Sequence, residues 1–197
     1  MTDRTTMVVT GVLVASMVVL AGIAGPVNAG ETPTKKEIKL KAKKDIIDAM
    51  AAETLRRLLE RSPKAESLYE KAYGYAVFDS LKLALGISGG GGNGVAVRKD
   101  TGERIYMKMG TVGIGLGLGG QKYQVVFLFA DRATFDNFVN RGWEADATAQ
   151  AVAGTEGANA KTDFRNGMAV YQLTEAGLMA HVDIAGTRYW KNDKLNR

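Results

Sequence analysis

Apolar residues recur at helical spacing in three parts of the chain. Over residues 34–61 they follow one another at steps of three, four and seven, which places them on one face of a helix. Ser62 and Pro63 break this helix and begin a second one, with Ser62 as the cap and Pro63 in the first turn. Asp131 is expected to cap a third helix, which Gly142 ends. The pattern therefore predicts two N-terminal helices and one internal helix.

Apolar runs without helical spacing predict strands. Residues 124–129 are almost continuously apolar, as in a strand at the centre of a sheet. Segments 94–98 and 105–109 flank a turn at 99–102 and predict a hairpin. The other predicted strands are 75–78, the small-residue segment 145–153, and a second hairpin formed by 168–173 and 178–184, with its turn at 174–177.

Two glycine-rich segments lie among these strands. Residues 86–94 carry almost no side chains, and residues 112–119 alternate strictly between apolar residues and glycine. A strand with this alternation has bulky side chains on one face and bare backbone on the other. Glycine weakens a strand, and its usual reason is the close approach of another part of the chain. We expect the bare face to lie under a helix or inside a tightly curved sheet.

Together these elements predict an α+β fold. The N-terminal helices cover a glycine-rich, curved, mainly antiparallel sheet, and one helix is inserted after the strand at 124–129. Closure of this sheet into a barrel-like form is left open. A doubly wound parallel sheet is disfavoured, because the strands follow one another without intervening helices.

The N-terminus has the pattern of a secretory signal peptide. Asp3 and Arg4 precede an apolar run over 7–23, and Val27 and Ala29 provide small residues before a cleavage site that follows Ala29. The alternative is a retained membrane anchor, because the run is nearly long enough to span a bilayer. We divide the chain into a signal peptide (1–29), a basic helical segment (30–65) and a domain (66–197). We expect secretion across the inner membrane into the periplasm, with or without association with the outer membrane.

Composition limits the chemistry of the secreted protein. The 197 residues contain no cysteine, which excludes disulfides, thiolate metal sites and a cysteine nucleophile. The formal net charge of +5 is a modest excess that favours anionic partners. In a chain without a nucleic-acid-binding motif, this excess is too small to suggest binding to DNA or RNA.

The glycine-rich and histidine-containing segments do not predict catalysis. Residues 115–120 match G-x-G-x-x-G, but a strand follows them, whereas that motif needs a helix N-terminus for the phosphate. His181 and Asp183 would share a strand face, yet no serine lies in a nucleophile elbow and no further metal ligands accompany them. We expect neither an enzyme nor a catalytic residue, cofactor or metal site.

The chain resembles the SYLF domain family. The resemblance rests on the order and spacing of the glycine-rich run at 86–94, the alternating segment at 110–120, the strand at 124–129 and the C-terminal residues 178–191. The family is a lipid-binding module, with phosphoinositide-binding eukaryotic members and actin-associated yeast members. The resemblance implies binding of acidic phospholipids through a basic surface near the N-terminal helix. In a bacterial envelope the expected partner is a membrane surface that contains phosphatidylglycerol or cardiolipin, and no actin is expected there.

Two groups of residues are candidates for lipid binding. The entrance of the first helix carries six lysines spread around the helix axis, so a solvated segment and a binding face are equally good interpretations. In the C-terminal tail, Trp190 and Tyr189 could lie at the membrane interface with Arg188 and Lys191 beside them, and ordinary core or edge packing of Trp190 is the alternative. The candidates are Lys35, Lys36, Lys39, Lys41, Lys43, Lys44, Arg188, Trp190 and Lys191.

We expect the function to be non-enzymatic, peripheral binding of acidic phospholipids at the cell envelope. The alternative is a structural or protein-interaction module of the periplasm or outer membrane, which has an envelope protein as its partner and no lipid ligand.

Overall fold

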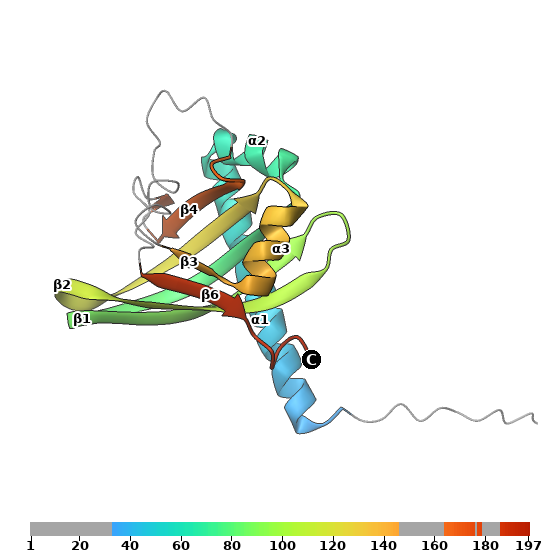
Figure 1. Cartoon of the computed structure of the whole chain (residues 1–197). Helices are drawn as coiled ribbons and strands as arrows, with labels where there is room; N and C mark the ends of the chain where they lie inside the picture. Colours follow the sequence, from blue (N-terminus) through green and yellow to red (C-terminus); the bar gives the residue numbers. More distant parts are fainter. Residues whose placement is uncertain (1–32, 146–163, 176, 179–185) are drawn as a thin grey trace, which may run out of the picture. The chain divides into compact units, whose positions relative to one another are not determined.

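The computed structural model describes residues 33–145, 164–175, 177–178 and 186–197, with the backbone alone at 82–88, 113–119 and 121. These residues form three helices and one six-stranded sheet (Figure 1). The elements are α1 (Lys35–Arg61), α2 (Pro63–Lys71), β1 (Gly74–Arg98), β2 (Arg104–Phe129), α3 (Arg132–Arg141), β3 (Trp143–Ala145), β4 (Met168–Thr174), β5 (Gly177–Leu178) and β6 (Thr187–Lys191). The predicted α+β class with a curved antiparallel sheet is confirmed.

The second and third helices begin at the caps that the sequence predicts, and the structure adds a cap for the first. Thr34 and Glu37 form a reciprocal capping box at the start of α1. Ser62 accepts a hydrogen bond from the backbone of Ala65 and so caps α2, and Asp131 caps α3. Gly142 ends α3 in the left-handed region, at φ 74°, which glycine adopts without strain. None of the described helices is long and apolar enough to cross a membrane.

Strands β1 and β2 form one long antiparallel ribbon. Their pairing runs from Gly74 opposite Phe129 to Val97 opposite Arg104, with one shift of register between Leu85 and Ile87. The segments predicted as four short strands are thus the ends of two long ones. The glycine-rich residues between them continue the strands.

The ribbon folds back on itself, and glycine makes this possible. A Cβ atom at Gly92 would overlap the carbonyl oxygen of Asp79, and one at Gly94 would overlap that of Val77. The two halves of β1 therefore approach each other at backbone distance, as expected for a tightly curved sheet. For residues 113–119 the side-chain environment is outside the described part, so the expectation for the alternating segment stays a prediction.

Strand β2 is the centre of the sheet. Its first half pairs with β6, from Met107 opposite Lys191 to Thr111 opposite Thr187. Its second half pairs with β4 over residues 124–129, which confirms the predicted central strand. Strand β5 pairs with β4 and confirms the start of the second hairpin, and β3 pairs with β6 at the edge. The predicted strand segments 146–153 and 179–184 lie outside the described residues.

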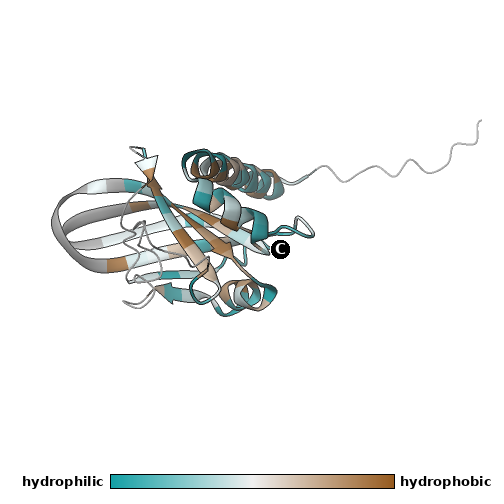
Figure 2. Cartoon of the chain, turned by 90° about the horizontal axis from the view of Figure 1, so that it is seen from above, coloured by the Kyte–Doolittle hydropathy of each residue, from teal (hydrophilic) through white to brown (hydrophobic). Residues whose placement is uncertain are grey.

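The curved sheet separates two apolar cores. Figure 2 shows α1 and α2 on one side of the sheet and α3 on the other. The core under α3 is dominated by aromatic side chains, which are Phe78, Phe127, Phe129, Phe135, Phe138 and Tyr189. The other core joins α1 and α2 to the outer face of the sheet, through residues that include Ile47, Leu55, Leu58, Val126 and Leu128. The sheet is thereby fixed from both sides.

Candidate functional site

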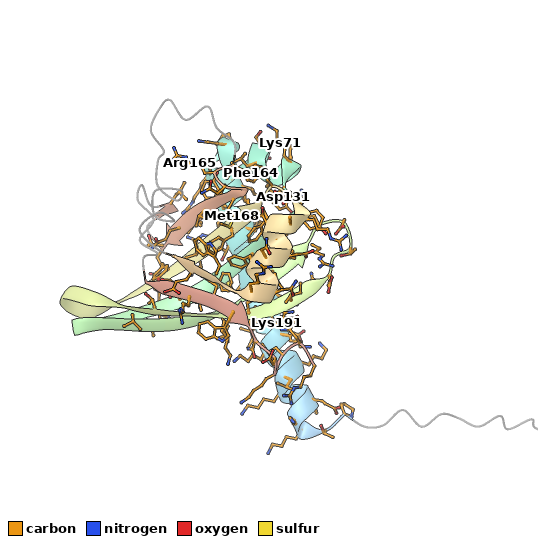
Figure 3. The ribbon with its side chains drawn as sticks, viewed as in Figure 1. Lys71, Asp131, Phe164, Arg165, Met168 and Lys191 are labelled. Carbon is orange, nitrogen blue, oxygen red and sulfur yellow. The ribbon has the colours of Figure 1, made fainter. Side chains whose placement is uncertain are left out.

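The predicted lysines lie on the half of α1 that has no fully buried residue, although Leu40 packs against the edge of the core. Between Lys35 and Ile46 no residue is buried, and Ile47 is the first that is. In Figure 1 this half of α1 extends past the sheet, and Figure 3 shows side chains along it that point away from the sheet. At about 1.5 Å per residue, the twelve residues from 35 to 46 form a rod about 18 Å long. We call residues 35–46 the basic half of α1.

The basic half is positively charged, and most of its charge is unpaired. It contains six lysines and only two acidic residues, Glu37 and Asp45, which leaves a formal excess of four positive charges. Lys41 pairs with Asp45 at 2.7 Å between Nζ and Oδ2, and the Nζ of Lys44 lies 5.2 Å from the centre of the Tyr106 ring. The other four lysines have no carboxylate partner among the described residues, and these are Lys35, Lys36, Lys39 and Lys43.

Two large apolar side chains accompany these lysines. Ile46 is 70% exposed and Ile38 is 56% exposed, although isoleucine is usually buried. Lys39, Lys43 and Ile46 are separated by four and three residues, so they share one face of the helix. The six lysines are spread round the axis, as the sequence indicates, but one face combines ammonium groups with an exposed isoleucine.

A polar cluster fastens the base of the basic half to the sheet. The hydroxyl of Tyr106 on β2 donates a hydrogen bond to Oδ2 of Asp48, 3.0 Å away. The Nε of Arg104 lies 3.5 Å from Oδ1 of the same carboxylate. Burial, and then the hydrogen bond to Asp48, raise the pKa of Tyr106 to about 12. The phenol is therefore protonated at neutral pH and remains a donor to Asp48.

The C-terminal candidates lie on β6, where alternation divides them between two faces. Tyr189 points inward, is almost fully buried among Phe78, Phe127 and Trp143, and burial raises its pKa well above the ordinary value. The prediction that Tyr189 lies at a membrane interface is therefore wrong. Its place in the alternation makes it a core residue. Trp190 points outward and is 43% exposed.

Trp190 is partly packed, because its ring lies against a bare stretch of β2. A Cβ atom at Gly110 would come 3.1 Å from Cη2 of the indole, so the ring packs closely on the bare backbone there. Arg188 also points outward, and its Nη2 pairs with Oε2 of Glu144 on β3 at 2.6 Å. Lys191, labelled in Figure 3, instead donates to the Asn140 side chain of α3, at 3.1 Å.

A groove runs beside Arg188 and Trp190. It has a volume of about 660 Å³ and lies where the end of α3 meets β3 and β6. Its lining residues are Arg141, Gly142, Trp143, Glu144, Arg188, Tyr189 and Trp190. Sequence reasoning missed Arg141, Trp143 and Glu144, because only the pairing of β3 with β6 brings them to the tail. The sequence did contain one indication of this site, which is the tryptophan Trp143 directly after Gly142 at the end of α3.

The two groups of candidates lie on different elements, the lysines on α1 and the tail residues on β6. No hydrogen bond, ion pair or ring contact joins the lysines of the basic half to Arg188, Trp190 or Lys191 in the described ranges. His181 and Asp183 lie outside those ranges. Within them, no cluster of three or more histidine, aspartate or glutamate side chains could hold a metal ion.

Comparison with known proteins connects this architecture to a family. Residues 110–197 match the family model Ysc84, described as "Las17-binding protein actin regulator". The chain is also 46% identical over 149 residues to Beta cell expansion factor A from Aeromonas veronii. That match covers 76% of this chain and 57% of the relative, so the chain spans little more than half the length of the relative.

Proposed function

Since residues 110–197 place the chain in the Ysc84 (SYLF) family, we propose that the protein is a non-enzymatic, peripheral binder of acidic phospholipids. The basic half of α1 is its main anchor. The SYLF domain is known as a lipid-binding domain, which gives the general function. The preference for acidic lipids is our inference from the charge of the basic half.

The observation that carries this proposal is the set of four unpaired lysines beside two exposed isoleucines. Each lysine near an anionic membrane surface contributes about 1 kcal/mol of attraction. Isoleucine side chains at the same level can enter the boundary between headgroups and acyl chains. Ile46 shares a face with Lys39 and Lys43, so one approach to the membrane serves both interactions.

The location that we propose is the bacterial envelope. The N-terminal pattern of 1–29 supports export. An exported protein meets membranes in which phosphatidylglycerol and cardiolipin are the available acidic lipids. The name of the family model refers to actin regulation and that of the relative to beta cell expansion. Export into the periplasm would give this protein neither actin nor such cells as a partner.

Co-sedimentation with lipid vesicles tests the proposal. We expect the protein to sediment with phosphatidylcholine vesicles that contain phosphatidylglycerol or cardiolipin, and to remain in solution with phosphatidylcholine alone. Binding should weaken as salt rises, because exposed charges are screened beyond about 8–10 Å at physiological ionic strength. Absence of binding at low salt would refute the proposal. It would favour the alternative, an interaction module that uses the exposed isoleucines against an envelope protein.

A further inference from the structure

We infer that the groove along β3 and β6 is a second lipid site, which binds the phosphate of a phosphatidylglycerol-type headgroup. This inference rests on the proposed function and gives it a specific site. The basic half of α1 offers charge on flexible side chains, which attracts any anionic surface. The groove combines arginines and tryptophans in a concave site, and an adjoining hollow adds amides. A concave site of this kind is the surface that selects one ligand.

The arginines of the groove suit a phosphate. Arg141 lies in the last turn of α3, and no carboxylate pairs with it among the residues that the structure describes. Arg188 is held by Glu144, whose Oε2 accepts from Nε at 2.7 Å and lies 2.6 Å from Nη2. Both partners of this pair are largely exposed, so the pair contributes little and a phosphate can take the place of the carboxylate. Arginine binds phosphate through paired N–H donors.

Glu144 consequently acts as a competitor for the ligand. It holds Arg188 across the β3–β6 pair while the groove is free. It also lowers the formal charge of the groove from +2, which Arg141 and Arg188 provide, to +1. Removal of its charge should therefore strengthen binding of an anion. A purely structural ion pair would not produce this effect.

The two tryptophans give the groove an apolar wall. Trp190 lies against Gly110, and Trp143 packs on Phe127 and Tyr189 with ring centroids 5.4 and 5.7 Å apart. Indole rings favour the level where headgroups meet acyl chains. These are the only two tryptophans of the chain, so tryptophan fluorescence, excited at a wavelength that tyrosine does not absorb, reports on the groove.

A smaller hollow adjoins the groove, and amide side chains form part of its lining. It has a volume of about 280 Å³ and shares Arg141, Gly142 and Trp143 with the groove. Asn137 and Asn166 also line it. Amides donate to and accept from hydroxyl groups, so a glycerol attached to a phosphate at Arg141 would find partners here. The arrangement therefore favours a phosphorylated polyol over a phosphate that carries a cationic choline.

Fluorescence titration of the full chain tests this inference. The probes are dihexanoyl phosphatidylglycerol kept below its micelle concentration, sn-glycerol 1-phosphate, and dihexanoyl phosphatidylcholine as the control lipid. We expect saturable changes with phosphatidylglycerol and none with phosphatidylcholine. A weaker response to glycerol phosphate would assign part of the affinity to the acyl chains. An equal response would support a headgroup site that needs no acyl chain. No saturable response to either phosphate probe would overturn the inference.

Three variants make the test specific. Arg141→Gln with Arg188→Gln should weaken binding about tenfold or more, and Glu144→Gln should strengthen it about threefold. The matched control is Arg132→Gln, which removes an arginine from the other end of α3 and should leave the titration unchanged. Equal weakening by Arg132→Gln, or weakening by Glu144→Gln, would overturn the inference. Circular dichroism confirms that each variant is folded.

The same titration separates this inference from the proposed function. A chain with Lys35, Lys36, Lys39 and Lys43 replaced by Gln should lose vesicle binding but keep the response to monomeric phosphatidylglycerol. Vesicle binding without a fluorescence response would refute the groove and leave the proposed function intact. A fluorescence response without vesicle binding would refute the basic half as the anchor and leave the groove intact.

Discussion

The two halves of α1 belong to one continuous helix but have opposite surroundings. From Ile47 onward, the helix buries one face against α2 and the sheet, and Arg57 donates to the carbonyl oxygen of Thr174 at 2.9 Å. Before Ile47, nothing is buried and the surface carries lysines and exposed isoleucines. The packed second half thus holds the helix in place, and the basic half continues this helix beyond the core. We conclude that the second half specifies the fold and the basic half is available for binding.

The largest effect should come from removal of a core side chain in the second half. Leu58 is fully buried between α1 and the sheet, so Leu58→Ala should lower the free energy of unfolding by about 3 kcal/mol. The matched change in the basic half, Ile46→Ala, should alter it by no more than about 0.5 kcal/mol, because Ile46 contacts solvent. Urea denaturation measures both. Similar losses in the two variants would show that the basic half is also packed.

A smaller effect is expected where the two halves meet. The pKa of Tyr106 is raised from its ordinary value near 10 to about 12 by burial and by Asp48. The folded protein then keeps the phenolic proton over a pH range in which the unfolded chain loses it. The stability that this provides is fully present below pH 10 and is lost as the pH rises from 10 to 12. Tyr106→Phe should lower the free energy of unfolding at neutral pH by about 1 kcal/mol, which is the contribution of one hydrogen bond.

The pH dependence provides the control for that prediction. Chemical denaturation should show that the free energy of unfolding of the wild type is lower at pH 11 than at pH 9. In Tyr106→Phe this decrease should be absent. An equal loss in both proteins would mean that other groups cause the dependence and that Tyr106 does not fasten the helix to the sheet.

The smallest effect should be confined to the first turn of the basic half. Thr34→Ala removes the capping box with Glu37, and such caps contribute about 1 kcal/mol to helix stability. Because the described residues of this turn are all exposed, we expect faster amide hydrogen exchange there and an unchanged midpoint of global unfolding. A lower midpoint would indicate that the basic half folds as one unit with the core.

The same contrast explains how far the sequence predicts this structure. The starts of α2 and α3 followed from local chemistry at Ser62 and Asp131, so they could be predicted directly. The central strand at 124–129 was equally clear from its continuous apolar side chains. In contrast, the fold-back of β1 depends on Gly92 and Gly94 meeting carbonyls thirteen and seventeen residues earlier in the chain. Nothing local distinguishes such glycines from those of a loop.

The candidate residues show the same limit. The lysines could be named from the sequence, since exposure is the ordinary state of lysine. For the tail, alternation along β6 decides that Tyr189 is core while Arg188 and Trp190 face outward. The partners Arg141, Trp143 and Glu144 come from a segment more than forty residues away, through the pairing of β3 and β6. Long-range pairing of this kind has no signal in a single sequence.

The central claim is that the basic half of α1 anchors the protein to anionic membranes, and a pair of charge-matched variants tests it most directly. One variant replaces Lys35, Lys36, Lys39 and Lys43 by Gln. The other replaces Arg61, Lys64, Lys122 and Arg132 by Gln, which are exposed outside the basic half. Both lower the net charge equally. In co-sedimentation with phosphatidylglycerol vesicles, the first should bind at least about tenfold more weakly than the wild type, whereas the second should stay close to it. Equal weakening would show that only total charge matters, and would contradict the claim.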